Sequence, residues 1–88
     1  MTVYMVERNL KGIEMSALAE AQQAAIRKAN DFRAEGTPMR YIRSTFAPED
    51  GRCMCLFEAE SPEDVKRLND EAQIPYDRVV VAMDLTPP

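Results

Sequence analysis

The chain has 88 residues, the length of a single domain spanning residues 1–88. It contains no histidine, which excludes catalysis by an imidazole base and zinc sites built on histidine side chains. Its 11 basic and 15 acidic residues give a net charge of −4, which argues against nucleic acid as a partner.

Three further observations concern the compartment in which the protein works. No apolar run approaches the roughly 20 residues that cross a bilayer, so we expect no membrane partner. Residues 1–8 lack the basic and apolar pattern of a signal peptide. Cys53 and Cys55 are one residue apart and do not make a disulfide framework. Together these observations predict a cytoplasmic protein with reduced thiols.

The first half of the chain predicts a strand followed by a long helix. Thr2–Glu7 is rich in β-prone and apolar residues. Ser16–Glu35 consists mostly of good helix formers, and we expect Ser16 to cap its start and Gly36 to end it. One apolar stripe recurs at three- and four-residue spacing along it, at Leu18, Ala21, Ala25, Ala29 and Phe32.

A hairpin is predicted in the middle of the chain. Met39–Phe46 and Arg52–Ala59 have strand composition, and a short polar turn joins them. Asp50-Gly51 supplies the positive φ that such a turn needs. We therefore expect the two strands to pair in antiparallel fashion.

A second helix and a last strand complete the pattern. Ser61 is the expected cap of the helix, and Pro62 suits its first position. Ile74-Pro75 is expected to stop it, because proline disfavours a helical residue before it. Arg78–Leu85 is the predicted last strand.

The order β-α-β-β-α-β predicts an α+β, ferredoxin-like fold, with a four-stranded antiparallel sheet and two helices on one face. Cys53, Cys55, Phe57 and Ala59 share one face of their strand, which we assign to the helices together with Val79, Val81, Met83 and Leu85. The opposite face carries Met54, Leu56, Val80 and Ala82 and is too apolar to stay comfortably in water. Since a domain of this size buries only about 60% of its surface, we expect a homodimer of the dimeric α+β barrel type, formed through this sheet face.

The two cysteines invite a metal or redox interpretation. Their side chains point the same way along a strand, at a spacing of about 6.5 Å set by two strand rises. A metal or a disulfide would strain a flat strand at that distance, and the chain offers no third or fourth soft ligand. We therefore interpret them as buried small hydrophobes and predict no metal ligands.

A polar cluster on the open face is the candidate ligand-binding site. Its residues are Tyr41, Arg43, Arg52 and Glu58, with Tyr4 or Glu7 nearby. A few polar groups in an apolar cleft are typical of small-molecule sites, and Glu58 is the best candidate for a catalytic acid or base. The alternative is a set of cross-strand ion pairs that fixes register and dimer geometry.

Several segments resemble a small bacterial family called domain of unknown function 4242. Val3–Arg8 is similar to its opening strand, Tyr41–Phe46 and Glu49–Ala59 to its central hairpin, and Ile74–Val79 to the entry of its last strand. The resemblance implies a ferredoxin-like dimer, in a family that includes a nickel-binding member. Nickel is thus the one cofactor suggested, by resemblance alone, and the absence of histidine removes its preferred nitrogen ligand.

Three functions are compatible with these features. The first is a small homodimeric binding protein that takes a small-molecule ligand or a metal ion in a cleft on the open sheet face. The second is a cofactor-free enzyme, similar to monooxygenases, isomerases or cyclases of the dimeric α+β barrel type, with Glu58 as acid or base. The third is a structural or regulatory module that uses the same face as an interface only.

Overall fold

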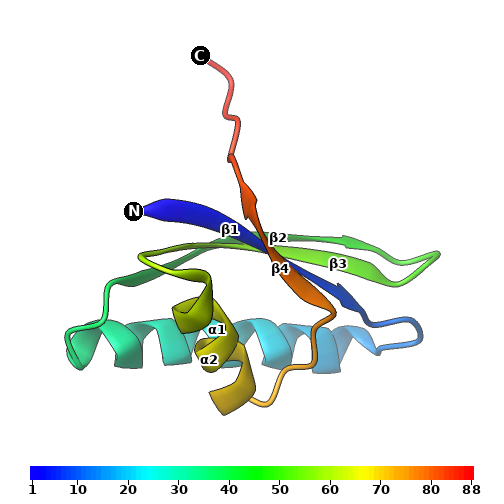
Figure 1. The fold of residues 1–88 in the computed structure, drawn as a ribbon. Coiled ribbons are helices and arrows are strands. Elements are labelled where there is room, and N and C mark those ends of the chain that lie inside the picture. The colour runs from blue at the N-terminus through cyan, green and yellow to red at the C-terminus, as the bar shows by residue number, and fades with distance from the viewer.

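Strands and helices follow one another in the predicted order in the computed structural model, which describes all 88 residues. The elements are β1 Thr2–Asn9, α1 Met15–Ala34, β2 Met39–Ala47, β3 Arg52–Ala59, α2 Pro62–Glu71 and β4 Arg78–Ala82. The strands form one antiparallel sheet in the order β2-β3-β1-β4, and both helices cover the same face of it (Figure 1). The predicted α+β, ferredoxin-like fold is confirmed. Neither helix combines the length and the apolar character needed to span a membrane.

The alternation predicted for β3 is confirmed by burial. Cys53, Cys55, Phe57 and Ala59 are buried beneath the helices, whereas the residues between them stay partly exposed. In α1 the apolar stripe buries Ala25, Ala29 and Phe32 against the sheet. The core lies between the sheet and this stripe, and Val65 and Leu68 of α2 close one side of it.

The helix caps agree with the sequence only in part. Asp64 donates its backbone N–H to the Ser61 hydroxyl at 3.2 Å, as predicted for the second helix. Gly36 follows the end of α1 with a φ of +91°, as expected of a terminating glycine. The prediction for Ser16 was wrong: α1 begins at Met15 with Glu14 at the cap position, so Ser16 already lies inside the first turn.

Two predicted ends also differ from the structure. Helix α2 ends at Glu71, before Ile74-Pro75, because Gln73 adopts a left-handed conformation with φ 59° that turns the chain away. Strand β4 ends at Ala82 rather than Leu85, since its pairing with β1 finishes opposite Val3. Three residues that the sequence assigns to the helix side are instead exposed: Val81 by 71%, Met83 by 78% and Leu85 by 83%. The reason is that the edge strand and the tail extend beyond the helices.

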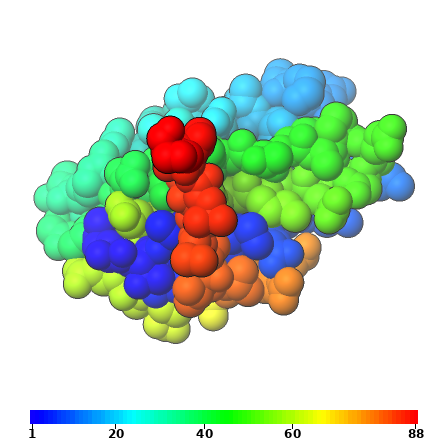
Figure 2. Space-filling model, turned by 90° about the horizontal axis from the view of Figure 1, so that it is seen from above, coloured from blue at the N-terminus to red at the C-terminus, as the bar shows by residue number.

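The sheet face away from the helices, here called the open face, has an apolar centre. Met5 of β1 lies opposite Leu56 on one side and Val80 on the other. Further apolar side chains around this row are Val3, Met54 and Ala82, all of them partly exposed. The segment after β4 rises from this face and passes over it toward β2, as Figures 1 and 2 show from two directions. The open face is therefore an apolar surface that no helix covers and that the C-terminal tail crosses.

Candidate functional site

The structure separates the four residues predicted as a ligand cluster. Tyr41 lies on the helix side of the sheet, opposite the buried Phe57, and its ring meets that of Phe57 edge to face with 5.5 Å between centroids. The cause is a β-bulge at Ile42, because register shifts between Tyr41 and Arg43. One extra residue reverses which side chains face the helices, so Arg43 lies opposite Leu56 on the open face. The prediction that Tyr41 shares a face with Arg43 was wrong.

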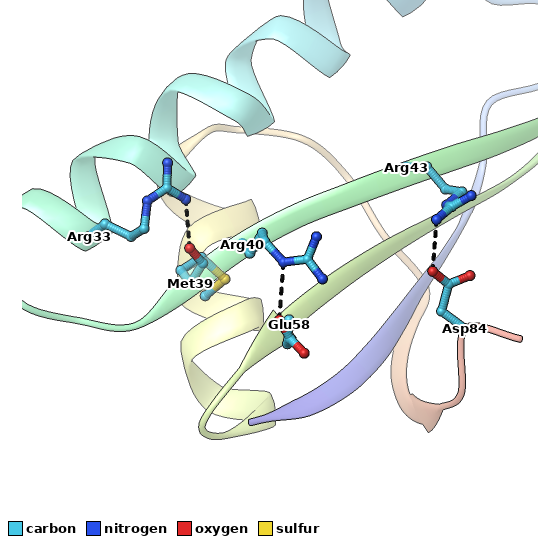
Figure 3. A network of polar contacts seen from close by, with 6 residues as sticks. All are labelled: Arg33, Met39, Arg40, Arg43, Glu58 and Asp84. Carbon is cyan, nitrogen blue, oxygen red and sulfur yellow. Dashed lines mark hydrogen bonds and ion pairs between the residues drawn. The ribbon is translucent and has the colours of Figure 1, made fainter. Parts of the chain in front are cut away.

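Arg43, Arg52 and Glu58 do lie on the open face, but each is held in a separate ion pair. Glu58 Oε1 accepts from Arg40 Nε at 3.1 Å, and Arg43 Nη2 donates to Asp84 Oδ2 at 2.9 Å (Figure 3). Arg52 pairs with its own turn, where its Nε lies 2.9 Å from an oxygen of Asp50. The hydrogen bond from the backbone N–H of Arg52, followed by the contact with its side chain, lowers the pKa of Asp50.

These pairs surround the apolar centre of the open face without converging on a common point. The two residues predicted to lie near the cluster do not join it either. Glu7 accepts from Arg78 at 2.6 Å, and Tyr4 is buried in the core. Exposed pairs of this kind contribute at most about 1 kcal/mol each to stability. Glu58 is held by Arg40, and its role as a catalytic acid or base stays a prediction.

A cavity of about 150 Å³ lies on the other side of the sheet, between α1 and strands β1, β2 and β3. Its walls are mostly apolar, from Leu18, Ala21 and Ala25 of the helix to Phe46 and Ile74. The sheet places two adjacent rows of side chains along its floor. Ser44 lies opposite Cys55 in one row, and Phe46 and Arg8 flank Cys53 in the other. This space is the α1 cavity.

A chain of hydrogen bonds runs along one wall of the α1 cavity. Gln22 Nε2 donates to the Tyr41 hydroxyl at 3.0 Å, and that hydroxyl lies 2.6 Å from Ser44 Oγ. Ser44 in turn donates to Cys55 Sγ at 2.9 Å. The chain links an exposed helix residue to a buried thiol, and it depends on the bulge that brings Tyr41 and Ser44 to the same side.

The thiols of Cys53 and Cys55 are free, buried and closer than strand geometry suggested. Their sulfur atoms are 3.8 Å apart, not about 6.5 Å, because the side chains lean toward each other. Burial, followed by the neighbouring thiol of Cys55, raises the pKa of Cys53 to about 11. At neutral pH Cys53 is therefore a neutral group, and the prediction that both cysteines pack as buried hydrophobes is confirmed.

Arg8 is the residue of this region that the sequence analysis missed. Its side chain lines the α1 cavity and the residue is only 4% exposed, yet no carboxylate lies within 4.0 Å of it. Nη1 donates to the carbonyl oxygen of Pro75 at 3.2 Å, and the side chain also interacts with the neighbouring Cys53 thiol. A buried charge costs several kcal/mol unless it is paired. The alternation of Tyr4, Val6 and Arg8 on the core side of β1 was the signal that could have found it.

Comparison with known proteins assigns the chain to a family. Residues 4–81 match the family model described as "Nickel responsive protein SCO4226-like". The chain belongs to the SCO4226-like family. The crystal structure of SCO4226 from Streptomyces coelicolor A3(2) superposes with a TM-score of 0.78 at 23% identity, covering 97% of this chain and 99% of that one, and this likeness concerns the fold. None of the curated proteins compared with the chain is a match.

The donor groups of one chain do not fit a nickel ion. Imidazole is a favoured ligand of nickel, and the chain has none. No three Cys, Asp or Glu side chains converge anywhere in the structure. The thiol pair is the closest approach to a donor set, but Cys53 lies directly opposite Arg8, whose positive charge repels a cation. The α1 cavity therefore has the electrostatics of a site for a neutral or anionic ligand.

Proposed function

We propose that this member of the SCO4226-like family is a small binding protein whose α1 cavity holds a small molecule. The observation that carries the proposal is a buried arginine without a carboxylate partner in the wall of a space of about 150 Å³. A protein interior packs closely, so a partly open pocket beside an arginine that has no carboxylate partner is unusual. Mostly apolar walls with a few polar groups are the normal composition of small-molecule sites.

Binding to the α1 cavity can be tested with a neutral probe of suitable size. A titration of ¹⁵N-labelled protein with benzyl alcohol is expected to shift the amide resonances of residues that line the cavity, such as Leu18, Ala25 and Ser44. The resonances of the open face, for example that of Leu56, serve as the internal control. Saturating shifts confined to the cavity support the proposal, whereas no shift at millimolar probe contradicts it.

We further propose that two copies of the chain pair through the open face. Two observations support this assembly: the uncovered apolar row of Met5, Leu56 and Val80, and the ion pairs that neutralise the charges around it. Apolar surfaces with neutralised surroundings are suited to protein contacts. The exposed Leu85 of the tail, which leaves the sheet on this side, is available to contact a second copy.

The dimer can be tested by sedimentation equilibrium with two matched variants. Leu56→Lys places a charge at the centre of the open face and is expected to give a folded monomer. Val81→Lys places the same charge at a position on the helix side of the sheet edge that is 71% exposed, and it is expected to leave the dimer intact. A wild-type monomer, or equal dissociation of both variants, contradicts the proposed interface.

Nickel is the first metal to test, because the family is described as nickel responsive. Since the donors of the chain do not fit this ion, we expect native mass spectrometry to show no stoichiometric nickel on the purified protein. The double variant Cys53→Ala, Cys55→Ala is the control. One nickel ion per chain, lost in that variant, would show that the thiols are ligands after all.

A further inference from the structure

We infer that the ligand of the α1 cavity is a small organic anion, a carboxylate with a single ring or a short chain, whose charged end binds Arg8. The inference rests on the proposed function and adds the chemical class of the ligand. Three features of the cavity support it: the charge of Arg8, the nature of the walls and the available volume.

The charge of Arg8 is the first feature. A guanidinium group has five N–H donors, of which one is donated to the carbonyl oxygen of Pro75 and another has the Cys53 thiol as a weak partner. None of the residues that line the cavity is acidic, so no side chain there neutralises the charge. Cys53, the cross-strand neighbour of Arg8, is a neutral thiol at physiological pH. The two oxygens of a carboxylate match the fork geometry of a guanidinium and would satisfy further donors.

The walls are the second feature, and they distinguish an organic anion from an inorganic one. Leu18, Ala21, Phe46 and Ile74 surround the space next to the guanidinium with apolar surface. Phosphate or sulfate would have to leave water on all sides to enter such a space, at a cost that one arginine does not offset. An apolar ring or chain gains from contact with the same walls. A ligand that is charged at one end and apolar at the other therefore fits best.

The volume is the third feature, and it limits the size of the ligand. The volume of about 150 Å³ is comparable to that of an engineered cavity in another protein that holds benzene. The space thus admits one aromatic ring or a chain of a few carbons, and excludes nucleotides and cofactors. The residues that line the cavity, the exposed Gln22 among them, include no acidic side chain that would repel an approaching anion.

The test compares benzoate with benzyl alcohol, a neutral molecule of nearly the same shape, on the full chain by calorimetry and by NMR. A hydrogen-bonded charge pair should favour benzoate by about tenfold or more in Kd. Arg8→Met, which keeps an unbranched apolar stem, is expected to abolish that preference, whereas Arg8→Lys is expected to keep part of it. Arg78→Met, which removes an exposed arginine from the same sheet, is the matched control and should behave as the wild type.

The outcomes separate this inference from the proposed function. Tighter binding of benzoate that depends on Arg8 supports both. Binding of benzyl alcohol with equal or weaker binding of benzoate overturns the inference and leaves the cavity as a site for neutral ligands. Failure of both probes to bind overturns both proposals. If Arg8→Met does not fold, the benzoate preference of the wild-type protein decides the matter without it.

Discussion

Filling the α1 cavity from the helix side should stabilise the protein and remove its binding site at the same time. Ala21 of α1 lines the cavity, so Ala21→Leu would place three additional carbons in existing space. Burial of each carbon contributes about 0.8 kcal/mol, and ordering of the leucine side chain costs about 0.5–1 kcal/mol. Because Ala21 is only partly buried, we expect the free energy of unfolding to rise by about 1 kcal/mol.

Urea unfolding followed by circular dichroism measures this change, and benzyl alcohol binding provides the second readout. Ala19→Leu is the matched control, since Ala19 lies on the exposed side of the same helix and the substitution fills no space there. For Ala21→Leu we expect the urea midpoint of unfolding to rise at an unchanged m-value, and the binding of benzyl alcohol to be lost. If Ala21→Leu destabilises the protein while Ala19→Leu does not, the α1 cavity has no room for a leucine side chain. If probe binding survives, the probe binds elsewhere.

Three further predictions concern the turn after β2, the cap of α2 and the buried thiol. Gly51→Ala should destabilise the protein by more than about 2 kcal/mol, because φ is +76° and the new Cβ would lie 2.3 Å from the backbone of Lys11. Gly36→Ala, with a similar φ and open space, should cost only about 1 kcal/mol in the same urea assay. Ser61→Ala should cost about 1 kcal/mol by thermal unfolding, and no loss would contradict its role as a cap. Between pH 9.0 and about 11 the unfolded chain releases the Cys53 proton that the folded chain keeps, so stability should fall by up to about 3 kcal/mol, and a Cys53→Ala variant that shows the same fall would refute this origin.

The local chemistry of the chain was sufficient for much of the fold. The cap at Ser61, the terminating Gly36 and the alternation of β3 each depend on residues within one turn or one strand, and the structure confirms all three. Ser16 shows where such local reasoning stops. The helix begins at Met15, before Ser16, and its cap position is held by Glu14, which makes no side-chain cap hydrogen bond.

The candidate site depends on features that the alternation of side chains along a regular strand does not predict. A regular strand would put Tyr41 and Arg43 on the same face, and the bulge at Ile42 separates them. The distance between the thiols of Cys53 and Cys55 is set by the orientation of their side chains rather than by the rise of the strand. Neither feature has a signature in the residues themselves.

The sequence by itself therefore determined the order of the elements, the faces of β3 and the absence of histidine chemistry, because these follow from local propensity, two-residue periodicity and composition. Only the tertiary structure decided where the functional groups meet. It placed Arg8 in the core, brought Tyr41 to the helix side, and left a cavity between α1 and the sheet. The physical reason is that packing and register join residues that are far apart in the chain, and a void is a property of the space between elements rather than of any one of them.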